Sequence, residues 1–272
     1  MRDWLQHRLK TSRPIYLAAR SVYRAQVNLR RTVYWRLNAQ KAIRDFGRFE
    51  RRWYSQNGED GILQIIFEKI GATNRYCVEF GVENGEACNT RYLVEVQGWK
   101  GLRMDAGDYD RYFGEVQKEF ITAENINLLF RKYAVPKEFD LLSIDIDGND
   151  YWVWRAIEDY SPRVVVIEYN SSLGPDCSRT IPYDPAFRWD GTNFYGASIA
   201  ALAKLGDTKG YTLLACDSRG VNAFFLRNDL VDRRFVVRPV AQSYRPPGHG
   251  ILIDGKRVGH HPTPRISGMV EV

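Results

Sequence analysis

Three carboxylates stand at the end of one apolar segment of the chain. In the stretch LLSIDIDGND, residues 141–150, the apolar run gives way to Asp145, Asp147 and Asp150. If the run is a buried strand, Asp145 and Asp147 face the same way, and Gly148 allows the chain to turn. Close carboxylates repel each other and raise each other's pKa unless a cation or a hydrogen-bond donor lies between them.

A second polar pair follows the next apolar run, VVVIEYN. It ends in Glu168 and Asn170, which again share a face. Oxygen atoms from neighbouring strand ends suit a hard cation such as Mg²⁺, Mn²⁺ or Ca²⁺, which predicts a metal site at Asp145, Glu168 and Asn170. Two other interpretations stay open. Asp147 or Asp150 caps a helix N-terminus, or the acids form salt bridges with arginines.

A glycine turn is the third candidate feature. The stretch VEFGVENGEACN contains Gly81 and Gly85, which let the backbone approach a ligand closely. It lacks the GxGxxG pattern of the dinucleotide fingerprint. Asp105 ends the next predicted strand, 24 residues after Gly81, where a carboxylate can accept hydrogen bonds from a ribose diol. Together with Glu79 it would lie beside a cofactor that carries a positive centre. The alternative is an ordinary tight turn.

A parallel sheet would bring these residues together. After residue 53, strand candidates alternate with helix candidates, which predicts a doubly wound α/β fold with helices on both faces of a mostly parallel sheet. Ligands bind such sheets beyond the carboxyl ends of the strands. The expected strands are 76–82, 101–106, 121–127, 139–146, 163–170, 211–218 and 222–228, the last two an antiparallel pair at the sheet edge. The expected helices are 60–71, 85–98, 111–120, 126–135, 151–160 and 198–210, and from residue 239 we expect loop.

The N-terminal arm, residues 1–52, differs in charge from the body, residues 53–272. The arm has 14 Lys and Arg against three acids, a net +11, and the body has 25 against 30, a net −5. Apolar residues recur at helical spacing in the arm, at Ile15, Ala18, Val22, Ala25, Leu29, Val33 and Leu37, with Arg20, Arg24 and Arg31 opposite. This amphipathic basic helix packs on the body or on a second subunit of a homo-oligomer, lies on an anionic membrane surface, or binds nucleic acid.

Length and composition predict a globular protein of the cytoplasm. The 272 residues suffice for one large α/β domain with an appended segment. The four cysteines form no CxxC and no zinc pattern, which favours a reducing compartment. No apolar run approaches the roughly 18 residues of a spanning helix, and the N-terminus lacks the apolar core of a signal peptide.

Three stretches resemble the FkbM-type S-adenosylmethionine-dependent methyltransferases. They are SQNGEDGILQIIF, CVEFGVENGEACNTRYLVEVQGWKGLRMDA and FDLLSIDIDGNDYWVWRAI, which occur in this order between Ser55 and Asn170. The pattern is moderately specific: an E-x-G-x-x-x-G turn, a GW-x-G before the second strand and a D-x-(D/E)-G after the fourth. The resemblance implies a seven-stranded Rossmann-like methyltransferase sheet and O-methylation of a sugar or polyketide hydroxyl.

The resemblance also assigns site residues. It places Glu79, Gly81, Gly85 and Asp105 along the cofactor, Asn125 near the adenine, and Asp145 where the cofactor pocket opens toward the substrate. Asp145, Glu168 and Asn170 are similar to the metal ligands of other O-methyltransferases of this fold, with one extra residue between the last two. Glu83 stands where many methyltransferases have glycine.

Residue types predict which side chains bind the methyl acceptor and which one acts as general base. The long segment 170–198 carries Tyr183, Trp189, Asp190 and Tyr195, whose aromatic faces and polar groups suit a sugar ring or simply hold the loop in place. A metal at Asp145 would lower the pKa of the acceptor hydroxyl. Without a metal, the base would be Asp147 or one of the C-terminal histidines His249, His260 and His261, which are otherwise structural.

The sequence thus favours an S-adenosylmethionine-dependent O-methyltransferase, assisted by Mg²⁺ or Mn²⁺. Its predicted substrate is a sugar hydroxyl of a glycan or glycolipid precursor in polysaccharide biosynthesis, and the arm would bring it to the inner face of a membrane. The rival is a non-catalytic binding or assembly module that keeps the fold. A nucleic-acid methyltransferase is disfavoured because the body has a net charge of −5 and phosphate binding needs a basic face.

Overall fold

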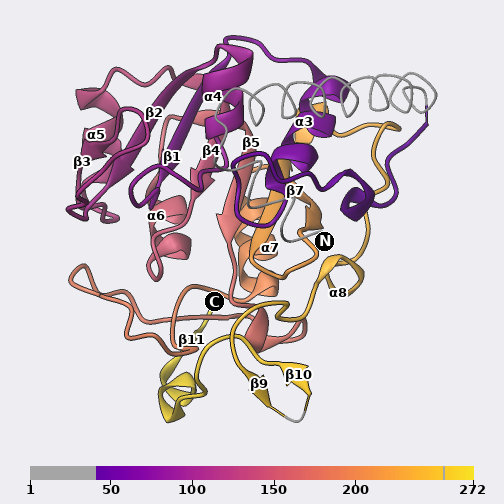
Figure 1. Ribbon diagram of the computed structural model, residues 1–272. Helices are drawn as coiled ribbons and strands as arrows, with labels where there is room; N and C mark the ends of the chain where they lie inside the picture. Colours follow the sequence, from indigo (N-terminus) through magenta and orange to yellow (C-terminus); the bar gives the residue numbers. More distant parts are fainter. Residues whose placement is uncertain (1–40, 254) are drawn as a thin grey trace, which may run out of the picture. The chain divides into compact units, whose positions relative to one another are not determined.

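The computed structural model describes residues 41–253 and 255–272 (Figure 1). The chain divides into two compact units, Met1–Ala42 and Ile43–Val272. The helix predicted for the arm, and its proposed contacts with lipid, protein or nucleic acid, lie outside the described residues. Residues 43–52, which the charge pattern assigns to the arm, belong to the larger unit, where Ile43 forms a β-bridge with Phe235 and Phe46 stacks on the same ring.

A seven-stranded sheet forms the centre of the larger unit (Figure 1). Its order is β3-β2-β1-β4-β5-β8-β7, and β8 alone among these strands runs antiparallel to both its neighbours. The strands are β1 (Tyr76–Phe80), β2 (Lys100–Asp105), β3 (Gln117–Lys118), β4 (Glu138–Ile144), β5 (Ser161–Glu168), β7 (Tyr211–Cys216) and β8 (Asn222–Arg227). The prediction of a mostly parallel sheet with an antiparallel pair at one edge is therefore confirmed.

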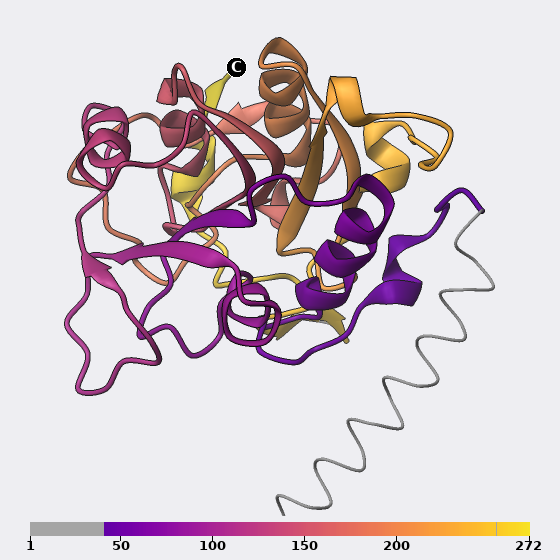
Figure 2. The same ribbon diagram turned by 90° about the horizontal axis from the view of Figure 1, so that it is seen from above.

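Helices cover both faces of this sheet (Figure 2). One face carries α3 (Glu59–Ile70) and α4 (Arg91–Gln97), and the other carries α5 (Ile126–Lys132), α6 (Asp150–Ala156) and α7 (Ile199–Thr208). Successive strand residues serve opposite faces: in β4, Leu142 and Ile144 pack in the cluster under α5–α7, while Leu141 and Ser143 face the other way. Because both faces are covered, the central strands are apolar throughout, which makes them recognisable in the sequence.

The segment between β2 and α5 differs from the prediction. The helix expected at 111–120 and the strand expected at 121–127 are both wrong, because the chain forms a loop with the short strand β3 and then a turn into α5. Gly114 at φ 89° interrupts the first of these segments, and Gln117 pairs with Met104 of β2. The helix expected at 85–98 is confirmed only over α4.

Short elements make up the rest of the described chain. They are the 3-10 helices η1 (Phe46–Phe49), η2 (Ser171–Leu173), η3 (Asn228–Leu230) and η4 (Pro264–Gly268), the helix α8 (Val240–Ser243), the hairpin β9 (Leu252–Ile253) with β10 (Lys256–Arg257), and the pair β6 (Arg179–Thr180) with β11 (Val270–Glu271). All four cysteines are free. No helix in residues 41–253 or 255–272 combines the length and the apolar character of a membrane span.

The register of the sheet aligns the predicted site residues. Phe80 of β1 is level with Met104 of β2 and Ile144 of β4, and Ile144 is level with Ile167 of β5. The next residues of these strands, Asp105, Gly81, Asp145 and Glu168, therefore form one row across the carboxyl end of the sheet, as the sequence predicts.

Candidate functional site

A cavity of about 310 Å³ opens at this row. Its volume is at the lower end of the range for small-molecule sites, roughly 300–1,000 Å³. It is lined by Gly81, Glu83, Asp105, Ala106, Tyr109, Glu119, Phe120, Ile121, Asp145, Ile146, Asp147, Asn149, Phe187, Arg188 and Trp189. Acidic groups gather at the strand ends, and aromatic and aliphatic groups form the side toward β3.

Gly81 holds the floor of the cavity together. Its N–H donates to the Met104 carbonyl at 3.0 Å, its φ is +77°, and a Cβ here would lie 1.2 Å from the Asp145 carbonyl oxygen. Only glycine fits such an approach of two backbones at a positive φ. The tight β1 turn inferred from the sequence is therefore a structural requirement of this site.

Asp105 lies at the edge of the cavity and fixes its rim. Its Oδ2 accepts from the Glu83 N–H at 2.7 Å, and its Oδ1 accepts from the Gly107 N–H at 2.7 Å and from the Tyr109 hydroxyl at 3.1 Å. Burial and the Asp105 charge raise the pKa of Tyr109 to about 12. Asp105 thus ties the turn after β1 to the loop after β2, and it lines the cavity wall.

Two residues other than glycine line the cavity in left-handed backbone conformations. Glu83 has φ 49° and Asp147 has φ 54°. Such conformations cost of order 1 kcal/mol or more and cluster at functional sites. Burial, followed by the charges of Asp150, Glu83 and Asp105, raises the pKa of Asp147 to about 6, which suits a general base near neutral pH.

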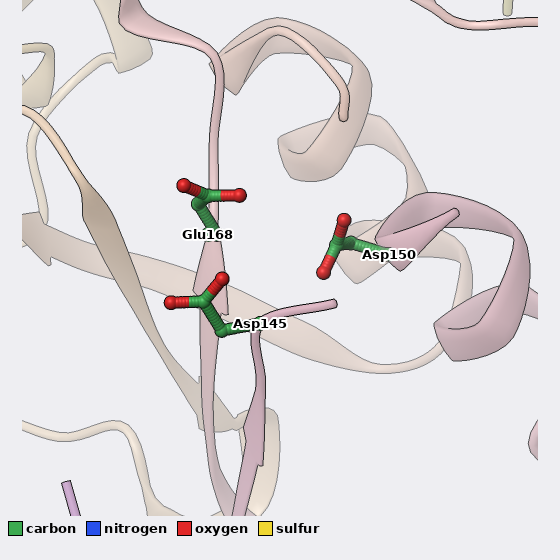
Figure 3. A group of neighbouring side chains, drawn as sticks. All are labelled: Asp145, Asp150 and Glu168. Atoms are coloured by element: carbon green, nitrogen blue, oxygen red, sulfur yellow. The ribbon is translucent and has the colours of Figure 1, made fainter. Parts of the chain in front are cut away.

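Three carboxylates gather beside the cavity floor (Figure 3). Each of Asp145, Asp150 and Glu168 has a carboxylate oxygen within 4.8 Å of those of the other two. Burial and the neighbouring carboxylates raise the pKa of both Asp145 and Glu168 well above its usual range. Oε2 of Glu168 is buried and has no hydrogen-bond partner among the described residues. The group has the donor atoms of a hard-cation site.

Asp150 also closes the turn that leads into α6. Its Oδ1 accepts from the Ile146 N–H at 2.8 Å and its Oδ2 from the Gly148 N–H at 2.9 Å. The alternative that Asp147 or Asp150 is the helix N-cap is wrong, because the N-cap is Asn149 and the N–H donors to Asp150 belong to the turn before the helix. Burial raises the pKa of Asp150, and the two N–H donors oppose that rise. Asp150 therefore takes part both in the turn and in the carboxylate group.

Asn170 turns away from that group. Its Nδ2 donates to the carbonyls of Asn193 and Tyr195, and its Oδ1 accepts from the Ser172 N–H as the cap of η2. These bonds use its amide to anchor the loop after β5. Asp150 takes its place in the set that the structure brings together, next to the two predicted ligands Asp145 and Glu168.

Glu79, Gly85 and Asn125 lie outside the cavity lining. The Glu79 carboxylate is buried and accepts from the N–H groups of Asn89 and Thr90, so it holds the segment before α4. Gly85 at φ +82° turns the chain against the Phe113 carbonyl. Asn125 caps the turn before α5, where its Oδ1 accepts from the Thr122 N–H. The structure thus gives the three predicted cofactor residues supporting positions.

An aromatic cluster stands next to the acids. Trp189 lines the cavity, and its ring centroid lies 4.5 Å from that of His260 and 6.2 Å from that of Tyr195. His260 also lies against His249, at 5.3 Å. Burial and the charges of Glu168 and Asp145 raise the pKa of Tyr195 well above its usual range. The structure thus brings together Trp189 and Tyr195, two of the predicted substrate residues, and His260, a predicted base.

The other predicted substrate and catalytic residues lie elsewhere. The Tyr183 hydroxyl donates to Glu124 and accepts from the Ala123 N–H, which ties the long loop to the segment before α5. Asp190 accepts from the Thr192 N–H and pairs with Arg265 at 2.6 Å. The side chain of His261 is exposed. These residues shape the loop and do not line the cavity.

The histidine pair predicts an acid-sensitive loop. Burial lowers the pKa of both His249 and His260, and nearby cationic groups lower the pKa of each further. Because the unfolded chain then binds more protons below pH 6.5 than the folded one, the unfolding free energy should fall as pH falls from about 6.5 through the folded pKa values. Urea titrations of the wild type and of His260→Gln from pH 8 to pH 5 should show this loss as a difference between the two proteins, because buried carboxyls with a raised pKa, such as Asp147, change the stability of both in the opposite direction. The exposed His261→Gln serves as control, and an unchanged slope in His260→Gln would contradict the prediction.

The lining includes residues that sequence reasoning missed. Tyr109, Asn149, Phe187 and Arg188 come from loops, where neither periodicity nor a strand end marks a position. Phe187 rests on Gly148, where a Cβ would come within 2.4 Å of the ring, and the Arg188 guanidinium lies 3.9 Å from the centroid of Phe120. The aromatic content of the segment 170–198 was the only sequence signal for these two.

Comparisons with known proteins add little beyond the fold. No family model and no curated protein matches the chain. Among solved structures, the chain is similar to the structure of the citrinin polyketide synthase CMeT domain, with 12% identity over 62% of this chain and a TM-score of 0.36. The match covers 51% of that chain, about half its length. The strand order and the antiparallel β8 decide the class. The sheet is a Rossmann-like, mostly parallel sheet of seven strands. At this level of similarity, what the fold does must be argued from its own cavity.

Proposed function

We propose that the protein is an S-adenosylmethionine-dependent methyltransferase. The observation that carries the proposal is the row of Gly81, Asp105 and Asp145 at the carboxyl end of this sheet, all three lining one cavity. Asp105 offers a carboxylate to a ribose diol, and Asp145 and Asp147 offer negative charge to a cationic ligand. The apolar side at Phe120, Ile121 and Phe187 suits a flat base.

We further propose that the acceptor is a hydroxyl and that a divalent cation assists. Asp145, Asp150 and Glu168 would hold Mg²⁺ or Mn²⁺, because three wholly or partly buried acids so close together need a compensating charge. A bound cation would lower the pKa of the acceptor hydroxyl. The chain's own contribution is to orient that hydroxyl and to remove its proton, for which Asp147 with a pKa of about 6 is suited. The methyl group of a sulfonium donor is already activated, so no covalent intermediate with the chain is needed.

A sugar is the acceptor class that we favour. Trp189 offers an aromatic face on the cavity wall, and the rings of Tyr195 and His260 pack behind it. A sugar ring stacks through its C–H face and binds through its hydroxyls. The FkbM-type resemblance, a glycan or glycolipid precursor and a cytoplasmic site at a membrane remain part of the proposal.

Binding of S-adenosylhomocysteine tests the proposal directly. A saturating ligand should raise the melting temperature of the wild-type protein by mass action. Asp105→Ala should lower the affinity by about 10- to 100-fold, since charge-assisted hydrogen bonds are worth about 1.5–3 kcal/mol. Asp108→Ala is the matched control, because Asp108 is an exposed acid three residues on that pairs only with the exposed Lys118 in the described contacts. Absence of any shift in the wild type would leave the rival, a non-catalytic module.

A further inference from the structure

Two segments of the larger unit carry an excess of arginine. Residues 43–52 and 232–245 contain eight arginines against the three acids Asp45, Glu50 and Asp232, a net charge of +5. The remaining residues of this unit, 53–231 and 246–272, have a net charge of −8. A positive region on an otherwise acidic body indicates a negatively charged partner.

Backbone hydrogen bonds hold the two segments side by side. The Ile43 N–H donates to the Arg234 carbonyl at 2.8 Å, and the Val236 N–H donates to the Ile43 carbonyl at 2.9 Å. The segments thus form one surface, which we call the basic face. Its acids already have partners in the described chain: Asp45 pairs with an arginine of the face, Asp232 with another, and Glu50 accepts from Ser218.

A small pocket lies in the basic face, over the end of the edge strand β7. It is lined by Arg44, Asp45, Phe46, Gly47, Leu214, Ala215, Cys216, Arg238, Gln242, Ser243 and Arg245. Its volume of about 20 Å³ gives room for about one water-sized group. A ligand can therefore place one oxygen atom inside, while the rest of the ligand stays outside the protein.

The three arginines of the pocket have no acidic partner among residues 41–253 and 255–272. Nη1 of Arg245 donates to the carbonyls of Gln242 and Tyr244 at 3.2 and 3.0 Å. The side chains of Arg44 and Arg238 form no hydrogen bond or ion pair with a described residue, and Asp45 pairs with Arg48 at 3.5 Å instead. Guanidinium groups without a carboxylate can bind an oxyanion such as phosphate.

We propose that the basic face binds an anionic phospholipid membrane, with one lipid phosphate at Arg44, Arg238 and Arg245. Val237 favours a membrane over nucleic acid, because it is 45% exposed and directly precedes Arg238, and an exposed apolar side chain between arginines suits the headgroup region of a bilayer. The net charge of −8 over the rest of the unit would repel a long polyanion beyond this face. This surface differs from the N-terminal arm, and its binding does not depend on methyl transfer.

Sedimentation of the full-length protein with lipid vesicles tests the proposal. Vesicles of equal parts phosphatidylglycerol and phosphatidylcholine should bind the wild type, and vesicles of phosphatidylcholine alone should bind it far more weakly. The triple variant Arg44→Ala, Arg238→Ala, Arg245→Ala should bind the anionic vesicles about 100-fold more weakly, since each basic residue at such a membrane contributes a factor of about five. Its affinity for S-adenosylhomocysteine should equal that of the wild type, because none of the three residues lines the cavity.

A control variant with the same change in net charge separates the basic face from a general charge effect. Lys100→Ala, Arg131→Ala, Arg155→Ala removes three exposed basic residues outside the face. It should bind the anionic vesicles within about twofold of the wild type, because salt screens charges that lie away from the membrane.

The two triple variants together decide the outcome. An equal loss in both would show only a net-charge effect, and wild-type binding in the arginine variant would show that the basic face takes no part; either result overturns the proposal. Binding of the wild type to duplex DNA or to inorganic phosphate, without binding to the anionic vesicles, also overturns it. Failure to bind S-adenosylhomocysteine would instead overturn the proposed function alone, since vesicle binding is measured without that ligand.

Discussion

Replacing Gly81 by alanine should abolish binding of S-adenosylhomocysteine. A Cβ at this position would lie 1.2 Å from the Asp145 carbonyl oxygen, so the turn after β4 must move away from β1. That movement displaces Asp145 and Asp147 from the cavity floor. We expect the affinity to fall by at least about 100-fold and the unfolding free energy by about 3 kcal/mol, the upper end of the usual cost of overpacking.

Gly98→Ala is the matched control for this variant. Gly98 has nearly the same φ, +71° against +77°, but no atom lies within 4 Å of an added Cβ. It should lose about 1–2 kcal/mol for the left-handed conformation and keep its affinity for S-adenosylhomocysteine. Circular dichroism establishes that both variants fold, and calorimetry gives the affinities. Wild-type affinity in Gly81→Ala would show that the ligand does not use this turn.

The row of site residues could be predicted because strand ends are marked in the sequence. Asp105, Asp145 and Glu168 each end an apolar run, and parallel strands in register bring such ends together. Alternation along a strand also predicted that Asp145 shares a face with Asp147, and Glu168 with Asn170. These inferences depend only on the period of the strand and on the direction of the chain.

The partners of each side chain could not be predicted in the same way. Glu79 and Asp145 stand on the same face of neighbouring strands, yet α4 covers the first and the cavity exposes the second. Asn170 shares the predicted face with Glu168, but the loop after β5 binds its amide. Which acid meets a helix terminus and which meets a ligand depends on loops whose course no local pattern specifies.

The same dependence on tertiary contacts explains why the helix and the strand predicted in the segment 111–127 are absent. Its aromatic and charged residues have helical spacing, but tertiary contacts decide its course: Glu119 N–H donates to the Asp105 carbonyl at 2.8 Å and adds β3 to the sheet edge. A strand of two residues has no period that a sequence can show. The positions of Phe120 and Ile121 in the cavity wall consequently could not be predicted from the sequence.

Glu168→Gln should change stability in opposite directions with and without a divalent cation. In the metal-free protein, the carboxylates of Asp145, Asp150 and Glu168 lie within 4.8 Å of one another, and burial and mutual repulsion raise the pKa of Glu168. Removing one charge relieves that repulsion, so the variant should melt at a higher temperature than the wild type near pH 8. It should also bind Mn²⁺ about 100-fold more weakly, because a neutral amide replaces a charged ligand.

Melting curves at several Mn²⁺ concentrations measure both effects. Above the dissociation constant, the wild type should gain stability in proportion to the logarithm of the Mn²⁺ concentration, until it melts at a higher temperature than the variant. Addition of EDTA should remove this gain, so that the variant again melts at the higher temperature. Glu158→Gln removes one exposed acid remote from the group and should follow the wild-type curve at every concentration. If Glu168→Gln is instead less stable without metal and equally responsive to Mn²⁺, the three acids are held by protons rather than by a cation, and Asp147 must act on the acceptor hydroxyl unaided.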